Sequence, residues 1–291
     1  MYGAIEAGGT KMICAVSDEN FNIIEKIQFP TTLPEENIKE MIDFFGKYDK
    51  ALKAIGLGTF GPVDINPESK TYGYILNTPK KGWQNFDFVG SLEKGLGIDV
   101  YLTTDVNAAA YGELKEGAGK GQNSLAYYTF GTGVGGGVIQ NKDFIGGRGH
   151  QELGHMIVNK HPDDKFEGIC YAHGTCLEGL ASGPSIEKRF GIPGKDLPIE
   201  DKFWDIEAYY IGQCVYNTVL AFNPDVIVLG GGVIQKEGLI EKVRDNYKKL
   251  MNDYISVENV DKYIVKPDRN GESAIIGALL LARDKAREKV G

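Results

Sequence analysis

The 291-residue chain is long enough to bury a substantial core, either as one large α/β domain or as two lobes around a cleft. Its composition of 42% hydrophobic and 25% charged residues, with a mean hydropathy of -0.24, is that of a globular protein rather than a disordered, fibrous or membrane-spanning one. The net charge of -8 argues against broad binding to nucleic acid or anionic lipid, and the N-terminus has no basic leader, so we expect neither partner and a cytoplasmic location.

The first fifty residues predict a β-hairpin followed by a third strand and a helix. Residues 4–7 and 12–16 are short apolar runs joined by a glycine turn, and residues 23–29 form a third run. From 35 to 48, just after Pro34, apolar residues recur at helical spacing. A βββα unit is therefore complete before the next strand begins.

The turn of this hairpin carries groups that bind a phosphate oxygen. Gly8 and Gly9 expose backbone N–H groups because they have no side chains. Thr10 adds a hydroxyl donor and Lys11 adds a cation. The chain has no GxxxxGK[ST], and no GxGxxG follows a strand in a dinucleotide-binding context, so the turn belongs to neither of the nucleotide folds that those motifs mark.

Asp105 lies between an expected strand at 100–103, which follows another at 54–57, and an alanine-rich helix at 107–115. Its carboxylate can project into a cleft at this junction, where it would orient an attacking hydroxyl and accept its proton. The alternative is an Asp that caps the helix, since Asp is a preferred N-cap residue.

A second hairpin follows with the same pattern as the first. A strand at 125–130 leads into a turn at 131–135, and the chain returns along 137–140. Both hairpins place a Gly-Thr pair at the turn, which predicts an internal duplication with one phosphate turn in each lobe. Two ordinary hairpins are the alternative, because glycine-rich turns are common.

The rest of the chain is mainly helical, with apolar-periodic runs at 203–222, 239–250 and 273–289. Between the first two, the apolar strand 226–229 leads directly into Gly230-Gly231-Gly232. A buried strand that ends in a glycine turn is a common ligand-binding corner of an α/β sheet. Three glycine loops at strand ends together predict a nucleotide clamped between two lobes.

Four residues in the middle of the chain have the order and chemistry of a zinc site. The cluster comprises His155, Cys170, His173 and Cys176. They supply four ligands for a tetrahedral ion, which leaves no open position for water and predicts a structural rather than catalytic zinc. The alternative is two buried thiols beside unrelated histidines. Trp83, Trp204, Tyr209 and Tyr210 are interpreted as core or interface residues.

Five motifs occur in the order found in the ROK family of bacterial sugar kinases, and the chain resembles that family over nearly its whole length. These motifs are IEAGGTK, TDVNAAA, GTGVGGG, ELGH and CLEG. The zinc-containing fructokinases of the family are the closest likeness, through FGPVD at 60–64, TPK at 78–80 before Gly82-Trp83, and HPDD at 161–164.

The resemblance implies a two-lobed actin-like ATPase fold of the ribonuclease H type, α/β in class, with duplicated βββαβαβα units around a cleft. One lobe is expected at 1–117, with a helix at about 273–291 packing back on it. The other is expected at 118–272 and includes the zinc loop 155–176. Because the family is often dimeric, we also expect a homodimer.

The implied activity is Mg²⁺- and ATP-dependent phosphorylation of a hexose, most closely D-fructose to fructose 6-phosphate, with Asp105 as the catalytic base. The sugar-binding positions are expected to be Gly61, Thr104, Asp105, Glu152, His155 and Glu178. The nucleotide-binding positions are expected to be Gly9, Thr10, Lys11, Gly131, Thr132, Gly133, Gly231 and Gly232. The family often has Asn and Asp where this chain has Thr104 and Glu6, so one sugar contact and part of the Mg²⁺ shell are left open.

Other functions stay open at this point. A glucokinase, a mannokinase or an N-acetylmannosamine kinase would differ in only a few hydroxyl contacts. A sugar-responsive repressor of the same family would need a helix-turn-helix, for which there is no room before Gly8. An actin-like ATPase without kinase activity would hydrolyse ATP whether or not a sugar is present.

Overall fold

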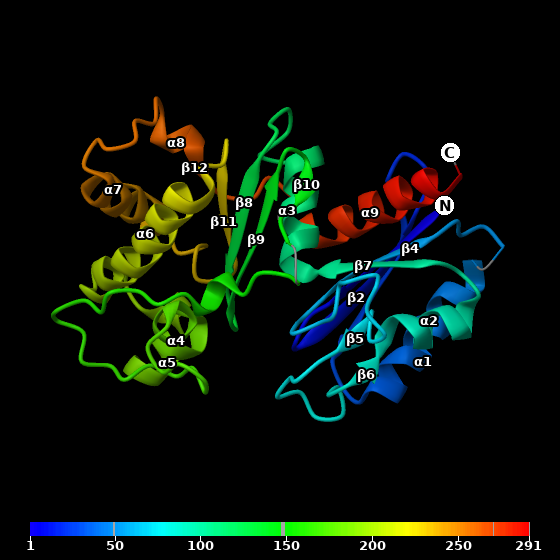
Figure 1. Cartoon of the computed structure of the whole chain (residues 1–291). Coiled ribbons are helices and arrows are strands. Elements are labelled where there is room, and N and C mark those ends of the chain that lie inside the picture. The colour runs from blue at the N-terminus through cyan, green and yellow to red at the C-terminus, as the bar shows by residue number, and fades with distance from the viewer. Residues whose placement is uncertain (49, 147–148, 270, 291) are drawn as a thin grey trace. The chain divides into compact units, whose positions relative to one another are not determined.

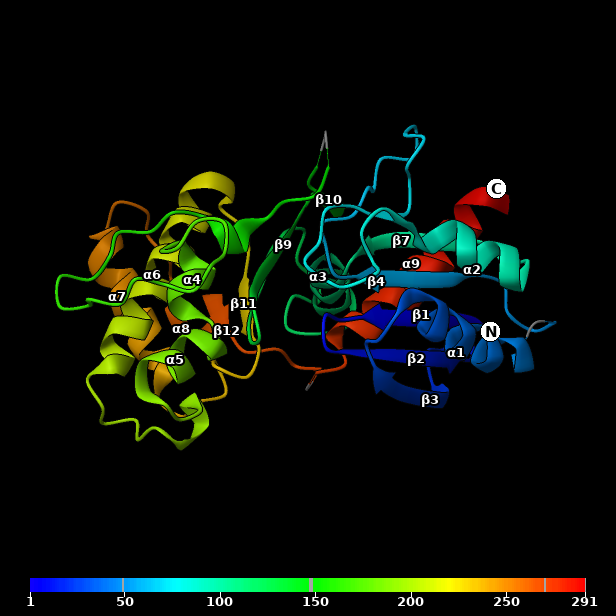
Figure 2. The same cartoon turned by 90° about the horizontal axis from the view of Figure 1, so that it is seen from below.

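The computed structural model describes residues 1–48, 50–146, 149–269 and 271–290, and it divides into two compact units. The first unit consists of Met1–Gly117, Ile145–His150 and Glu272–Gly291. The second consists of Ala118–Phe144 and Gln151–Gly271. Each unit contains one five-stranded mixed sheet with helices packed on it (Figures 1 and 2).

The sheet of the first unit has the strand order β3-β2-β1-β4-β7. Neighbours are antiparallel from β3 to β1 and parallel from β1 to β7. The strands are β1 (Tyr2–Ala7), β2 (Lys11–Ser17), β3 (Ile23–Pro30), β4 (Ile55–Thr59) and β7 (Val100–Thr104). Two short strands, β5 (Tyr74–Ile75) and β6 (Phe86–Asp87), pair separately.

Helices cover both faces of this sheet (Figure 1). They are α1 (Pro34–Phe45), a 3₁₀ turn η1 (Gly46–Tyr48), α2 (Phe88–Leu96), α3 (Asp105–Glu116) and α9 (Ser273–Val290). Strand residues alternate between the faces. Ile5 packs in the core with α1 and α2, whereas Ala4 packs with Ile275 and Leu279 of α9. The buried Ser273 hydroxyl donates to Glu113 of α3 at 2.6 Å and so fixes the start of α9 on this unit.

The sheet of the second unit has the order β10-β9-β8-β11-β12, which repeats the arrangement of the first. The strands are β8 (Leu125–Phe130), β9 (Val134–Gln140), β10 (Asp143–Phe144), β11 (Ile227–Gly230) and β12 (Ile264–Val265). The helical segments are η2 (Leu153–His155), α4 (Leu177–Ala181), α5 (Gly183–Phe190), η3 (Gly194–Asp196), α6 (Phe203–Phe222), α7 (Leu239–Met251) and α8 (Val260–Tyr263). Helices α6 and α7 lie side by side on this unit (Figures 1 and 2).

The structure confirms both predicted hairpins, and the shared strand order is what an internal duplication requires. Two boundaries differ from the prediction. β9 begins at Val134 rather than residue 137, because pairing with β8 keeps Gly135 and Gly136 extended. α3 begins at Asp105 rather than residue 107. The end of the C-terminal helix, expected at residue 291, lies outside the described residues, and no described helix is long and apolar enough to cross a membrane.

Candidate active site and metal centre

The predicted site residues of the first unit lie at one edge of its sheet. The parallel strands β1, β4 and β7 end in register, with Ala7 beside Thr59 and Thr59 beside Thr104. The residues that follow them are the glycine turn, Phe60-Gly61 and Asp105. The carboxyl edge of parallel strands is where ligands bind in open α/β sheets.

Asp105 is the first residue of α3, but it is not the cap of that helix. The N-cap is Thr104, whose Oγ1 accepts a hydrogen bond from Asn107 N at 3.2 Å. The Asp105 Oδ1 atom accepts from the next amide, Val106 N, at 2.8 Å. Helix α3 is therefore capped by Thr104 and not by Asp105. The carboxylate of Asp105 lies at the positive end of the helix dipole, where an anion is stabilised.

The first glycine turn is held by backbone bonds and by Thr31. Gly8 N donates to Lys11 O at 3.0 Å, while the Thr31 hydroxyl donates to Gly8 O at 2.7 Å and Thr31 N donates to Thr10 O at 3.0 Å. The turn is thus rigid without using the N–H groups of Gly9 and Thr10. The ammonium of Lys11 lies 3.5 Å from Gln28 Oε1 on β3.

Glu6 precedes this turn on β1 and has an unsatisfied oxygen. Its Oε2 atom is buried and makes no hydrogen bond in the described structure. Burial raises the pKa of Glu6 above its usual value, and the charges of Lys11 and Lys26 partly oppose the shift. A buried carboxylate oxygen of this kind fits a bound cation.

The second glycine turn lies at the carboxyl edge of the second sheet. Gly131 N donates to Gly133 O at 2.8 Å, and Gly183 N at the start of α5 donates to Gly131 O at 2.8 Å. The strand β11 ends beside this turn, where Val233 N donates to Phe130 O at 2.9 Å. The two predicted glycine loops of this unit therefore meet at one place.

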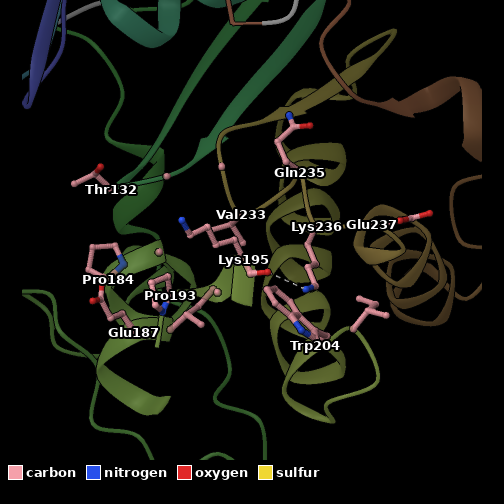
Figure 3. A pocket seen from close by; sticks show the side chains of 16 residues that line it. Thr132, Pro184, Glu187, Pro193, Lys195, Trp204, Val233, Gln235, Lys236 and Glu237 are labelled. Atoms are coloured by element: carbon pink, nitrogen blue, oxygen red, sulfur yellow. Dashed lines mark hydrogen bonds between the residues drawn. The ribbon is translucent and has the colours of Figure 1, made fainter. Parts of the chain in front are cut away.

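A pocket of about 820 Å³ opens at this meeting point (Figure 3). Three of its lining residues were predicted from the sequence, namely Gly131, Thr132 and Gly232, whereas Gly133 and Gly231 do not line it. Figure 3 shows Thr132 and Pro184 on one side of the pocket and Trp204 and Lys236 on the other. A volume in the range of roughly 300–1,000 Å³ is typical of cofactor sites.

The wall of the pocket formed by η3, Trp204 and Lys236 was not predicted from the sequence. The Lys236 ammonium donates to the carbonyls of Leu197 and Lys195 and lies 5.5 Å from the centre of the Trp204 ring. Lys236 thereby fastens the η3 segment to the loop after β11. Trp204 is a buried core residue, as predicted, but it also lines the pocket. No sequence signal links these segments, because they meet only in the folded unit.

Glu178 lies beside the second glycine turn. It is in the first turn of α4, and its Oε2 atom accepts a hydrogen bond from Val134 N at 3.0 Å. Glu152 precedes η2 and accepts through its backbone oxygen from His155 N at 3.0 Å. Of the predicted sugar-binding residues, Glu152, His155 and Glu178 belong to the second unit, and Gly61, Thr104 and Asp105 belong to the first.

The four predicted zinc ligands come together in the second unit. The donor atoms of His155, Cys170, His173 and Cys176 all lie within 4.8 Å of one another. His155 Nδ1 is 3.6 Å from the Sγ atoms of both cysteines, and His173 Nδ1 is 3.7 Å from Cys170 Sγ. Tetrahedral zinc with ligand bonds of about 2.0–2.3 Å would hold its donor atoms about 3.3–3.8 Å apart. The cluster therefore fits zinc, with His155 offering its Nδ1 atom as the ligand.

A buried charged cluster holds the middle of the zinc loop. Asp164 pairs with Arg189 of α5 at 2.9 Å and accepts from the Tyr210 hydroxyl of α6 at 2.7 Å. Burial opposes ionisation of Asp164, yet hydrogen bonds from Phe166 N and Tyr210 and the charge of Arg189 hold its pKa below the usual value. Nearby Glu207 is fully buried with both oxygens unpartnered in the described structure.

Glu207→Gln is expected to make stability less dependent on pH. Burial raises the pKa of Glu207 from 4.5 to about 8, with Arg189 opposing the shift and Asp164 adding to it. The folded protein therefore keeps a proton that the unfolded chain releases between these values, so stability falls as pH rises through this range. Melting curves at pH 5 and pH 8 should show a larger fall for the wild type than for Glu207→Gln. The exposed Glu241→Gln serves as control and should melt like the wild type, and equal falls in all three proteins would contradict the assignment.

Known proteins of one family match this chain over nearly its whole length. The model of the ROK family matches residues 2–285. The fructokinase of Streptococcus mutans is 50% identical over 288 residues, which cover 97% of each chain. The fructokinase of Lactococcus lactis is 50% identical over 284 residues, which cover 97% of this chain and 96% of the relative. The ROK hexokinase from Thermus thermophilus, a solved structure, superposes with a TM-score of 0.82 at 27% identity and 99% coverage of both chains.

Proposed function

Because the chain belongs to the ROK family, we propose that it is an ATP-dependent hexose kinase that converts D-fructose to fructose 6-phosphate, with Asp105 as the general base. Three relatives named fructokinase are 46–50% identical over 97% of this chain. Relatives named glucokinase are only 28% and 26% identical. Fructose is therefore favoured over glucose as the substrate.

The pocket of the second unit is the proposed nucleotide site. Its size and the glycine backbone of Gly131 and Gly232 suit a purine nucleotide, whose phosphates would contact the Gly131–Gly133 turn. The turn at Gly9, Thr10 and Lys11 in the first unit supplies further backbone donors for phosphate. Mg²⁺ bound to the phosphates would neutralise charge on the moving phosphoryl group, and the unpartnered oxygen of Glu6 is the donor that fits it.

Asp105 carries the acid–base part of the reaction. Its carboxylate accepts the proton of the sugar 6-hydroxyl as that oxygen forms a bond to the γ-phosphorus. The bond between the γ-phosphorus and the β–γ bridging oxygen breaks, and its electron pair leaves with ADP. Thr104 positions Asp105 by capping the helix on which the carboxylate lies. A direct contact between Thr104 and the sugar stays a prediction.

Glu152, Glu178 and the Nε2 atom of His155 are the proposed sugar ligands of the second unit. Carboxylates accept hydrogen bonds from hydroxyl groups, and a site built on such bonds rejects sugars that leave them unpaired. Structural zinc would hold His155 in place and would fix the start of α4, on which Glu178 lies two residues after Cys176. The expected homodimer and cytoplasmic location belong to the same proposal, and sedimentation of the purified protein tests the dimer.

The function is tested by coupled measurement of ADP release with fructose, glucose, mannose and N-acetylmannosamine. We expect fructose to give the highest kcat/KM. A higher value with another sugar would move the assignment to that kinase. ADP release at the same rate without any sugar would indicate an ATPase instead.

Gly232→Val is expected to weaken ATP binding without changing the fold. A Cβ atom on Gly232 would meet no atom within 4 Å, so the larger side chain would extend into open space at the wall of the pocket. Overlap with the nucleotide should raise the KM for ATP by roughly 10-fold or more. Gly46→Val is the control, because its Cβ also meets nothing within 4 Å but lies in the first unit at the end of α1. Equal KM values in both variants would place the nucleotide elsewhere.

A further inference from the structure

The side chain of Lys80, a residue outside the hairpin, lies against the first glycine turn. A Cβ atom built on Gly9 would be 3.1 Å from Cε of Lys80 and 3.5 Å from its Nζ. The Lys80 ammonium therefore lies against the backbone of the turn, although the two residues are far apart in the sequence. Both belong to the first unit.

The segment that carries Lys80 is firmly held. Lys80 N lies 3.4 Å from Thr78 Oγ1, and Trp83 N donates to Lys80 O at 3.2 Å. Trp83 is fully buried and packs edge-on against Phe60 and Phe88. Its indole N–H donates to Thr32 O at 2.8 Å, next to the residue that fixes the turn. The backbone of Lys80 is thus anchored in the core, and only its side chain reaches the turn.

Lys80 has no carboxylate partner among the described residues. Other lysines of the unit do pair with a carboxylate, namely Lys26, Lys39, Lys47, Lys53, Lys285 and Lys289. Lys80 is only partly exposed and makes no ion pair or side-chain hydrogen bond in the described part of the chain. The N–H groups of Gly9 and Thr10 also donate to no described acceptor. An unpaired cation above free backbone N–H groups is an anion-binding arrangement.

We propose that Lys80, rather than Lys11, supplies the cation that binds the phosphoryl group during transfer. This inference rests on the proposed kinase function. The exposed ammonium of Lys11 lies beside Gln28 on β3, whereas that of Lys80 lies over the turn. Asp105 is at the same edge of the same sheet, so the anion held there is the phosphoryl group that the sugar oxygen attacks. Lys80 donates hydrogen bonds to its oxygens and neither gains nor loses a proton.

Four variants test this role: Lys80→Met, Lys80→Arg, Lys11→Met and Lys94→Met. A hydrogen bond between charged partners accounts for roughly 10- to 100-fold in rate, so Lys80→Met should lower kcat by about that factor. The KM for fructose should stay within about 2-fold, because the lysine contacts the phosphoryl group and not the sugar. Lys80→Arg keeps the charge and should recover part of the rate, which a purely structural role would not predict. Lys11→Met tests the competing assignment and should lower kcat less than Lys80→Met does. Lys94→Met, which changes an exposed lysine in the last turn of α2, is the matched control and is expected within about 2-fold of wild type.

The ATP affinity of the same proteins, measured by calorimetry, separates this inference from the proposed function. If the wild type shows no fructose-dependent ADP release, the proposed substrate is wrong, and weaker ATP binding by Lys80→Met than by Lys11→Met would still support the phosphate contact. Wild-type kcat and ATP affinity in Lys80→Met would overturn the role of Lys80. A loss of kcat or ATP affinity in Lys11→Met as large as that in Lys80→Met would also overturn this role.

Discussion

Asp105→Asn is expected to lower kcat by about 10²- to 10⁴-fold, the range that a positioned general base contributes. The amide keeps an oxygen that can accept from Val106 N, and the cap of α3 is on Thr104, so the helix should form unchanged. ATP binding should also persist, because the change removes only the group that accepts the proton. The measurements are ADP release with saturating fructose, ATP affinity by calorimetry and the melting temperature.

The control for this variant is Glu36→Gln, which neutralises a carboxylate in the first turn of α1 in the same unit. It should retain wild-type activity and melt normally. Near-wild-type turnover in Asp105→Asn would remove Asp105 from the mechanism. Loss of turnover together with a large drop in melting temperature would instead indicate a structural role for the carboxylate.

Cys176→Ser is expected to release the metal and to loosen the loop that carries the sugar ligands. Wild-type protein should contain about one zinc ion per chain, and the variant should contain much less, since one of four ligands is lost. Because loss of the ion frees the loop that leads into α4, we expect the melting temperature to fall by about 5–10 °C. The KM for fructose should rise, because Glu178 and His155 lose their fixed positions. Metal analysis, melting curves and kinetics measure these effects.

Cys214→Ala provides the matched control. Cys214 is another buried thiol of the second unit, but it lies on α6 and is not one of the four clustered residues. This variant should keep its zinc even if it is somewhat less stable. A wild-type protein that is fully active without metal would refute the zinc proposal. Equal zinc content in both variants would exclude Cys176 as a ligand.

The sequence alone predicted much of the secondary structure, because its signals are local. Both hairpins were found from apolar runs on either side of glycine turns, and α6 was found with its observed bounds from helical periodicity. The boundaries that were wrong depend on contacts between segments. Gly135 was interpreted as a turn residue, and only the pairing of β9 with β8 holds it extended.

In the candidate site, too, the features that could be predicted were those with a local signal in the sequence. The residue types at 155–176 predicted a four-ligand cluster, and the fold brings their donor atoms together. The glycine turns were recognisable because a turn that exposes N–H groups needs particular residues within the turn itself. The strand end at Asp105 was recognisable too, although the residue that caps the following helix is Thr104 and not Asp105.

What only the tertiary structure decided is which distant side chains complete these local features. Lys11 is adjacent to the first turn in sequence, but successive side chains of a strand point to opposite faces, and its ammonium lies beside Gln28. Lys80 reaches the turn because Trp83 anchors its segment in the core. Lys236 and Trp204 likewise form one wall of the pocket. The chain by itself determined the backbone donors and ligand types, whereas long-range packing decided which charges lie beside them.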